Sequence, residues 1–302
     1  MALPTADTRV TYPAGELVSQ AVVVHVADLG DGRRAVFTDA TSIHPVDAGW
    51  PDQPADRGVL RVRGLELPIV DAVLAATDGT ALHVGADIPV RKGTEGWSFL
   101  VAHVVEDGAA VEIGDAVELE ADASYRRALS IGHTACHLAS LALNQALADR
   151  WSKTPRPDAL GAPDFDGTAI QSSRIGPGGS VDRYRLNKSL RRAGFDTASL
   201  ESPDALDGLA ASVNATLAEW VADGGAVRVE RDGDGLTDRR RWVAELPDGP
   251  ASIPCGGTHA TSAGELGEVR VSFATDDDGG TPVLVMTTRT TPTEVPPSAP
   301  RP

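Results

Sequence analysis

The sequence is poor in cysteine and in aromatic residues, and it contains no long hydrophobic run. Its 302 residues include two cysteines, and 4% of them are aromatic. Two cysteines make no disulfide framework, so each thiol is expected to be structural, catalytic or metal-bound. The first residues lack the basic and apolar regions of a secretory signal, and no apolar run approaches the roughly 18 residues of a membrane helix. We therefore expect a cytoplasmic protein that makes no contact with a membrane.

Positive charge is also scarce, because 27 Lys and Arg residues face 43 Asp and Glu residues, for a net charge of -16. Since Lys and Arg supply most non-specific affinity for nucleic acid, this balance argues against a broad RNA-binding surface. A concentrated patch can still bind a short end of an RNA, or it can be a solvated face that balances nearby Asp residues. The candidate RNA-binding patch consists of Arg183, Arg185, Lys188, Arg191 and Arg192, and a second cluster consists of Arg239, Arg240 and Arg241.

With 41% hydrophobic and 23% charged residues, the chain can bury a substantial core. From Thr8 to about Asp122, short β-branched runs alternate with Gly- and Asp-rich turns, a pattern typical of a small β-barrel or sandwich. The predicted strands are Ala21 to Val26, Arg34 to Phe37, Val59 to Val62, Ala81 to Val84, Ser98 to Val105 and Ala116 to Leu119.

The second half mixes helices and strands. Apolar residues at helical spacing predict a helix from Ser124, a candidate N-cap, to about Arg150, and a second helix from Asp204 to Ala222. Ser180 to Ala193 is expected to form a short basic helix, and 151–167 a Pro-rich loop. Strands are expected at Ala226 to Val229, Trp242 to Glu245, Glu268 to Phe273 and Val283 to Thr288, with a turn at 276–280 and a disordered tail at 291–302.

Two short motifs bring together side chains suited to zinc. His133 and His137 are four residues apart on the long predicted helix, so both rings lie on one face. Cys255 and His259 flank Gly256-Gly257-Thr258, and the glycines allow a tight loop. Three imidazoles and a thiolate are ligands that Zn²⁺ prefers. A purely structural zinc remains possible, since a catalytic ion must leave or create a position for water or substrate. Cys136 is expected to pack, because it points about 100° away from His137.

These motifs carry a resemblance to a known family. His-Thr-Ala-x-His on a helix with Cys-Gly-Gly-Thr-His downstream resembles the paired signature of the editing domain of alanyl-tRNA synthetase and its free-standing relatives, the alanyl-tRNA editing proteins. The resemblance covers about residues 8 to 290. Further segments that resemble family motifs are Asp122 to Arg127, Val213-Asn214, Ala263 to Gly267, and Gly49 to Gly58, a degenerate form of a Gly-rich Gln-Pro loop.

Three departures from the family pattern surround the expected pocket. The Gly-rich loop has lost most of its glycines, and the stretch from His137 to Gln171 is longer than usual and Pro-rich. The Arg-Phe-Asp-Phe strand of the family is replaced by Arg183-Tyr184-Arg185-Leu186-Asn187.

The resemblance implies an α+β fold: a small β-barrel-like domain at 1–122, then a zinc-binding editing-type domain at 123–290. It implies zinc-dependent hydrolysis of the aminoacyl ester of Ser- or Gly-tRNA(Ala), which protects the fidelity of translation. His133, His137, Cys255 and His259 would hold the zinc, which we expect to position the substrate more than to hold a permanent hydroxide. Thr134, Thr258 and Gln171, the counterpart of a family Gln, are candidates to orient water or the serine hydroxyl.

Two alternatives stay open. Some relatives look like transferases that move an aminoacyl group, such as serine, from tRNA to a small amine or hydroxylamine, and the altered pocket and the insertion at 151–167 agree with that chemistry. A non-enzymatic, metal-stabilised module that binds tRNA or an aminoacyl ligand is the other. The amino acid, the tRNA and the oligomeric state are not determined by the sequence.

Overall fold

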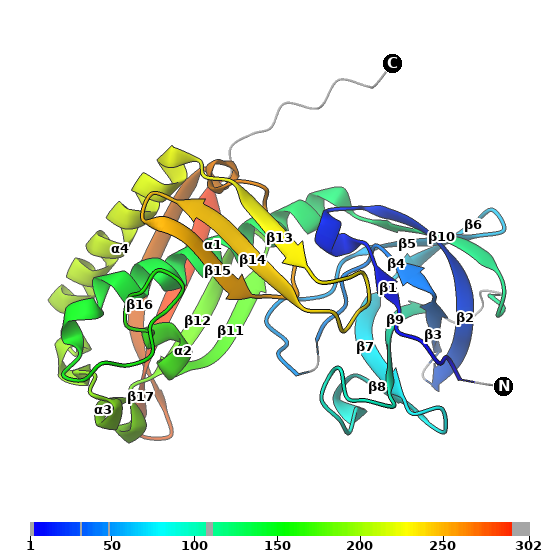
Figure 1. Cartoon of the computed structure of the whole chain (residues 1–302), viewed down its shortest axis with the longest axis horizontal. Helices are drawn as coiled ribbons and strands as arrows, with labels where there is room; N and C mark the ends of the chain where they lie inside the picture. The colour runs from blue at the N-terminus through cyan, green and yellow to red at the C-terminus, as the bar shows by residue number, and fades with distance from the viewer. Residues whose placement is uncertain (1–2, 31, 48, 107–110, 292–302) are drawn as a thin grey trace, which may run out of the picture. The chain divides into compact units, whose positions relative to one another are not determined.

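A computed structural model describes residues 3–30, 32–47, 49–106 and 111–291, which fold into two compact units (Figure 1). One unit contains the residues up to Ala128 together with Val229–Arg241 and Pro254–Thr258. The other contains Leu129–Arg228, Trp242–Ile253 and the residues from His259 onward. Helices and strands are both present, as expected, whereas the division into functional domains stays a prediction. In the part of the chain that is described, no helix is long and apolar enough to cross a membrane.

The first unit is built on a curled eight-stranded sheet with the order β6-β5-β10-β2-β3-β9-β7-β8. Each neighbouring pair in that order is antiparallel. A short parallel pair, β1 (Arg9–Val10) and β4 (Ala40–Thr41), lies outside this sheet. The strands of the sheet are β2 (Val18–Gly30), β3 (Arg33–Thr38), β5 (Gly58–Val62), β6 (Leu65–Ile69), β7 (Asp71–Thr77), β8 (Leu82–Val84), β9 (Ser98–Glu106) and β10 (Ala116–Ala121).

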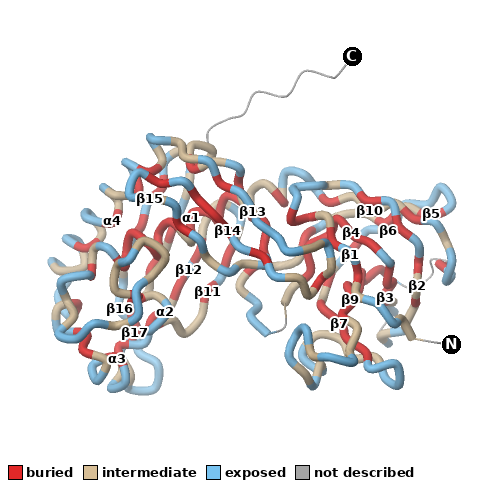
Figure 2. The backbone as a smooth tube through the Cα atoms, in the orientation of Figure 1, coloured by how far each residue is buried: buried red, intermediate tan, exposed pale blue. Residues whose placement is uncertain are grey.

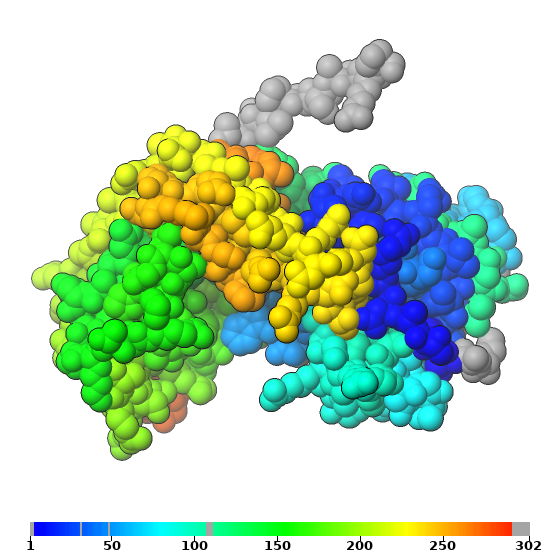
Figure 3. Space-filling model, viewed as in Figure 1, coloured from blue at the N-terminus to red at the C-terminus, as the bar shows by residue number. Residues whose placement is uncertain are grey.

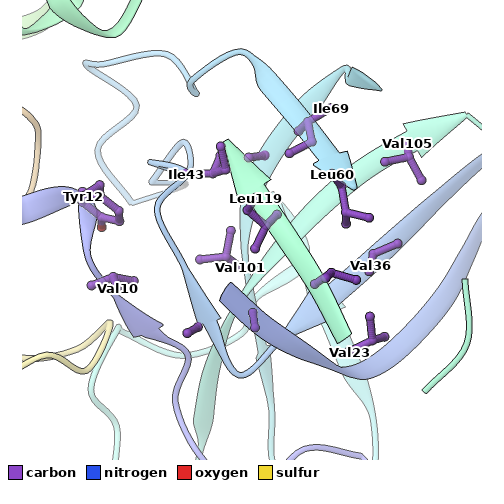
Figure 4. Close-up of a cluster of buried hydrophobic side chains, with 14 of the residues drawn as sticks. Val10, Tyr12, Val23, Val36, Ile43, Leu60, Ile69, Val101, Val105 and Leu119 are labelled. Atoms are coloured by element: carbon purple, nitrogen blue, oxygen red, sulfur yellow. The ribbon is translucent and has the colours of Figure 1, made fainter. Parts of the chain in front are cut away.

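Many residues of these strands are buried (Figure 2), and the hydrophobic ones form two separate clusters. The larger cluster includes Val36, Leu60, Val101 and Leu119 (Figure 4), and a smaller one contains Phe37 and Leu100. Since successive residues of a strand point to opposite faces, Leu100 and Val101 of β9 enter different clusters. This explains why β9 is buried at every residue from Phe99 to Val105 rather than at alternate residues.

A buried ion pair anchors the loop between β4 and β5. The Asp56 carboxylate accepts hydrogen bonds from the Arg126 guanidinium and, at 2.6 Å, from the backbone N–H of His44. Arg126 also donates to the carbonyl oxygen of Ser42 at 2.6 Å. The two charged side chains are 6% and 1% exposed, so each needs the other to compensate for its loss of water. Ser42 and Asp56, near the two ends of the loop, are thereby both fixed to Arg126.

The second unit contains helices α1 and α4 and a four-stranded sheet with the order β11-β12-β17-β16. Gly132 of α1 (Ala123–Ala146) allows close contact with the sheet, because a Cβ atom there would lie 2.3 Å from the Gly176 oxygen. Asn214 of α4 (Pro203–Asp223) exchanges two hydrogen bonds with Val271 of the edge strand β16, at 2.7 and 2.9 Å. The strands are β11 (Ile170–Gly176), β12 (Gly179–Arg185), β16 (Glu268–Asp278) and β17 (Thr281–Thr291).

The remaining elements are short. A three-stranded sheet has the order β13-β14-β15, with β13 at Val227–Arg231, β14 at Arg240–Leu246 and β15 at Gly249–Pro254. The short α-helices are α2 (Phe165–Ala169) and α3 (Lys188–Ala193). The 3-10 helices are η1 (Tyr12–Ala14), η2 (Gly85–Asp87), η3 (Ala148–Arg150), η4 (Thr197–Leu200) and η5 (Ala263–Leu266).

Several predicted boundaries were wrong. Asp122, not Ser124, accepts the first N–H groups of α1, at 2.9 Å from Ser124 N and 3.0 Å from Tyr125 N. The helix ends at Ala146 rather than near Arg150. The turn after β16 falls at Gly279 and Gly280, both with positive φ angles, since the strand continues through Asp278.

The predicted basic helix from Ser180 to Ala193 is half strand. Residues up to Arg185 belong to β12, and only Lys188–Ala193 are helical. Burial alternates along the strand, with Ser180, Asp182 and Tyr184 buried, and this period of two marks β structure. The predicted tail lies outside the described residues, except for Thr291, which ends β17.

We expect the substitution Asp56→Ala to lower the free energy of unfolding by about 3–5 kcal/mol, because it leaves the Arg126 guanidinium buried without its partner. Urea unfolding followed by circular dichroism measures the change. Glu66→Ala is the matched control, since its ion pair with Arg61 is largely exposed and should contribute less than about 1 kcal/mol. Equal effects of the two substitutions would contradict the role of the buried pair.

Candidate metal centre

Helix α1 presents two histidine rings on one face. The rings of His133 and His137 have centroids 4.8 Å apart, as their spacing of four residues requires. His133 is 2% exposed, and the neighbouring Thr134 is fully buried. The side chain of His137 also lies 5.0 Å from the ring of Trp242 on β14, which forms an apolar wall beside it.

The segment after β15 brings a third imidazole to this face. The ring of His259 lies 4.4 Å from that of His133 and 5.2 Å from that of His137. The hydroxyl of Thr134 accepts the backbone N–H of Ala260 at 3.0 Å and lies 3.3 Å from Nδ1 of His259. If Nδ1 carries the proton and donates it to Thr134, Nε2 keeps its lone pair for a metal. Thr134 therefore positions a candidate ligand.

Gln53 holds the residue that precedes His259. Its amide oxygen accepts the backbone N–H of Thr258 at 3.1 Å, and its amide nitrogen donates to the Thr258 hydroxyl at 3.0 Å. Gln53 is 2% exposed, and its amide nitrogen also lies 3.5 Å from Nδ1 of His44. Burial lowers the pKa of His44 to about 4, so this ring is neutral at physiological pH. The segment from Cys255 to Thr258 is thus fixed by side chains rather than by a ladder of strands.

The four predicted ligands form a cluster. One nitrogen each of His133, His137 and His259 and the sulfur of Cys255 all lie within 4.8 Å of one another. Tetrahedral Zn²⁺ would place such atoms about 3.3–3.6 Å apart, so small movements of the side chains complete the coordination. The backbone N–H of Gly257 points to the sulfur at 3.5 Å, which favours a thiolate there.

The protonation states fit a metal site. Nε2 of His137 is buried and has no hydrogen-bond partner among the described residues, an arrangement that costs free energy unless something binds it. Burial lowers the pKa of His137 to about 4, which leaves the ring neutral and able to ligate. Burial raises the pKa of the Cys255 thiol to about 12, and a bound cation would be needed to stabilise the thiolate.

The third predicted catalytic residue, Gln171, is bonded to a carboxylate at the end of β16. Gln171, on β11, donates its amide N–H to Asp278 at 2.9 Å. Its oxygen Oε1 is buried without a hydrogen-bond partner among the described residues, so an acceptor remains available. Cys136 is buried, and its sulfur lies 3.5 Å from a carboxylate oxygen of Asp182. Cys136 is thus absent from the ligand cluster and packs, as its position on the helix predicts.

The predicted RNA-binding patch divides into two parts. Arg183 and Arg185 on β12 form ion pairs with Asp276 and Asp278, at 2.7 and 3.2 Å. The other three cations are on α3, where Lys188 and Arg191 line a depression of about 320 Å³. Arg191 also donates to the carbonyl oxygen of Leu186 at 3.0 Å, which restricts its side chain.

The Gln-Pro loop is recognisable in the sequence, but no role in the site was predicted for Gln53. The signal was present, because Gln53-Pro54 and Asp56 survive in a loop that has lost its glycines. The structure explains their presence, since Asp56 binds Arg126 and Gln53 binds Thr258. Trp242 was predicted only as a strand residue.

The chain is similar to known proteins across most of its length. It is 27% identical over 237 residues to the alanyl-tRNA editing protein AlaX-M of Pyrococcus horikoshii, a match that covers 78% of each chain. It is 28% identical over 258 residues to the alanine–tRNA ligase of Ruegeria pomeroyi and 27% identical over 256 residues to that of Frankia alni. These two matches cover 83% and 84% of this chain but 25% and 24% of the ligases. No family model matches the chain.

We expect the purified protein to contain about one zinc ion per chain and the double variant Cys255→Ala, His259→Ala to lose it, because the cluster then keeps two of four ligands. Elemental analysis after dialysis measures the zinc content. Cys136→Ala is the matched control, since it removes the other thiol and should leave zinc in place. Full zinc in the double variant would show that the ion binds elsewhere.

Proposed function

The chain is a relative of the alanyl-tRNA editing proteins, and on that premise we propose that it hydrolyses the ester between tRNA(Ala) and a wrong amino acid, serine or glycine. The observation that carries the proposal is the His133, His137, Cys255 and His259 cluster in a chain with this relationship. The match to the editing protein covers 78% of that protein, whereas the ligase matches cover about a quarter of each ligase. Hydrolysis of a mischarged aminoacyl-tRNA is the activity proposed for the part of the chain that these matches share.

The proposal assigns zinc to the cluster. When bound by these ligands, zinc can polarise an ester carbonyl or orient the amino acid. The four side chains would occupy the usual four positions of a structural site, so we assign the ion mainly to substrate positioning. The same proposal includes a β-barrel-like domain at 1–122, an editing-type domain at 123–290 and a cytoplasmic location.

Thr258 is suited to contact the substrate. Its hydroxyl oxygen accepts a hydrogen bond from Gln53, which holds the side chain next to His259 in the sequence. A donor adjacent to a metal ligand can bind the ester carbonyl or the hydroxyl of a seryl group. Thr134 has another role, since its oxygen serves Ala260 and lies beside Nδ1 of His259.

Gln171 is assigned to the attacking water. Its unpaired oxygen Oε1 can accept a proton of water, while Asp278 holds the amide nitrogen and fixes which end of the amide is the acceptor. Such a residue acts by orienting the nucleophile rather than by removing a proton.

The RNA contact is assigned to α3. Arg183 and Arg185 are partly neutralised by the acidic end of β16, so Lys188, Arg191 and Arg192 supply most of the available charge of the patch. An acidic protein that binds only the acceptor end of a tRNA needs a local phosphate-binding surface of this kind.

Transfer of the amino acid to a small amine remains the competing chemistry, since it begins at the same ester carbonyl. It requires a second pocket for the amine, for which the segment 151–167 was the sequence candidate. The hydrolysis experiment includes an amine so that the two reactions are separated.

We expect zinc-loaded protein to release serine from Ser-tRNA(Ala) in plain buffer and to leave Ala-tRNA(Ala) intact. His133→Ala should reduce the rate by orders of magnitude. Gln171→Ala should reduce it by about 10²-fold, which is the lower end of the range for a side chain that takes part in proton transfer from the nucleophile. Acid-gel separation of charged and uncharged tRNA measures both rates.

Thr168→Ala is a control on the neighbouring helix α2, with a hydroxyl that bonds only the carbonyl oxygen of Asp164 among the described contacts. It should hydrolyse Ser-tRNA(Ala) at the wild-type rate. Ser-tRNA(Ala) that stays intact until hydroxylamine is added, and then yields seryl hydroxamate, would contradict hydrolysis and establish transfer.

We expect the double variant Arg191→Glu, Arg192→Glu to weaken tRNA binding and to flatten its salt dependence, because fewer cations then displace counterions from the phosphates. Filter binding at several salt concentrations measures both quantities. Arg239→Glu, Arg241→Glu changes the charge by the same amount in the second basic cluster and is the matched control. Unchanged affinity and salt slope in the α3 variant would identify the patch as a solvated face.

A further inference from the structure

The first unit contains a pocket of about 400 Å³ that the assignments above do not use. Its volume is within the range of small-molecule sites. Its lining comes from the loop between β4 and β5, from Leu74 of β7 and from 85–92, and the loop and 85–92 are visible on the face shown in Figure 3, in blue and cyan. The lining residues that matter here are Asp47, Trp50, Ile88, Val90, Arg91 and Lys92.

Trp50 makes this pocket unusual. Its side chain is 47% exposed, although an indole is among the most costly groups to leave in water. It faces the same pocket as the aliphatic side chains of Ile88 and Val90, so a flat ring inserted there would contact apolar surface on more than one side. Exposed aromatic rings of this kind bind unpaired nucleic acid bases by stacking.

The polar groups of the pocket suit a nucleotide. The guanidinium of Arg91 is exposed and has no ion-pair partner within the described ranges. Lys92 lies 2.7 Å from Asp47, whose other carboxylate oxygen accepts the backbone N–H of Gly49. A cation can bind a phosphate, and a fixed carboxylate can accept hydrogen bonds from ribose hydroxyls or from the amino group of a base.

The loop that contributes Trp50 to the pocket also carries Gln53, which contacts the segment of Cys255. Trp50 and Gln53 are three residues apart, so their Cα atoms are at most about 11 Å from each other. Gln53 in turn holds Thr258 through two hydrogen bonds.

We propose that this pocket binds the 3′-terminal nucleoside of the aminoacylated RNA, with its base stacked on Trp50 and its phosphate beside Arg91. The inference rests on the proposed function for the identity of the RNA. In this loop, where the related family has glycines, the chain has Trp50-Pro51. A side chain that stacks replaces a backbone that approaches the substrate closely, and the terminal nucleoside places its ester next to the Cys255 segment.

The test is binding of a fluorescein-labelled, single-stranded hexaribonucleotide that ends in CCA to the whole zinc-loaded protein, measured by fluorescence anisotropy. Adenosine 5′-monophosphate should compete for the same site. Trp50→Ala should weaken binding at least about fivefold, as expected for the loss of one base–aromatic stack, and Trp50→Phe should retain most of the affinity. Arg91→Gln should weaken binding and reduce its salt dependence.

Two substitutions in the β5–β6 hairpin of the same unit serve as controls. Leu65→Ala removes an exposed apolar side chain, and Arg63→Gln removes an exposed arginine, in both cases away from the pocket lining. Both should bind the oligonucleotide like the wild type. Each variant is also checked for zinc content and thermal melting, so that misfolding is recognised separately.

Wild-type protein that does not bind the oligonucleotide, or Trp50→Ala that binds it as well as the wild type does, would overturn the inference. If Ser-tRNA(Ala) is hydrolysed in that case, the proposed function stands without this pocket. Conversely, Trp50-dependent binding without hydrolysis of any aminoacyl-tRNA would support the pocket and refute the editing activity.

Discussion

The candidate metal centre depends on how the short segment from Cys255 to Ala260 is held. The backbone N–H of Cys255 donates to the carbonyl oxygen of Arg240 on β14 at 3.2 Å, and the rest of the segment must still aim a thiolate and an imidazole with the precision that a metal requires. Two side chains supply that precision. The amide of Gln53 bonds both the backbone and the hydroxyl of Thr258, and the hydroxyl of Thr134 bonds Ala260 and lies beside His259. Because these partners are buried, their hydrogen bonds do not compete with water, and the ligands keep one arrangement.

Electrostatics favours a cation at this point. Burial keeps His137 neutral and raises the pKa of the Cys255 thiol, so the site without a metal would contain an unpaired nitrogen and a protonated sulfur. A divalent ion satisfies both groups at once. Away from the metal centre, the net negative charge of the chain opposes the binding of RNA. The acidic residues before the Gly279-Gly280 turn pair with Arg183 and Arg185, and this leaves α3 as the more electropositive part of the patch.

The loop between β4 and β5 combines structural and recognition roles over a few residues. Asp56 neutralises the buried Arg126, Gln53 orients the Cys255 segment, and Trp50 remains at the surface. The loss of glycines therefore does not mean that the loop has lost its function. Its backbone can no longer approach a ligand as closely, but a rigid anchor at Asp56 holds a stacking side chain in place at low entropic cost.

The sequence by itself determined the elements with strong periodicity and the four side chains that meet in the candidate metal cluster. The histidines of α1 share a face because 3.6 residues make a turn, and α4 follows its apolar spacing, so both depend only on local geometry. The strand from Gly179 to Arg185 was wrongly predicted as part of a helix. Its charged residues are compatible with a basic helix, and only the alternate burial of Asp182 and Tyr184 in the structure reveals the period of two. Only the tertiary structure decided that Gln53 meets Thr258, 205 residues away, and that Trp50 and Arg91 line the same pocket. Such contacts depend on how loops are placed by the elements that flank them, and no local pattern of residues encodes that placement.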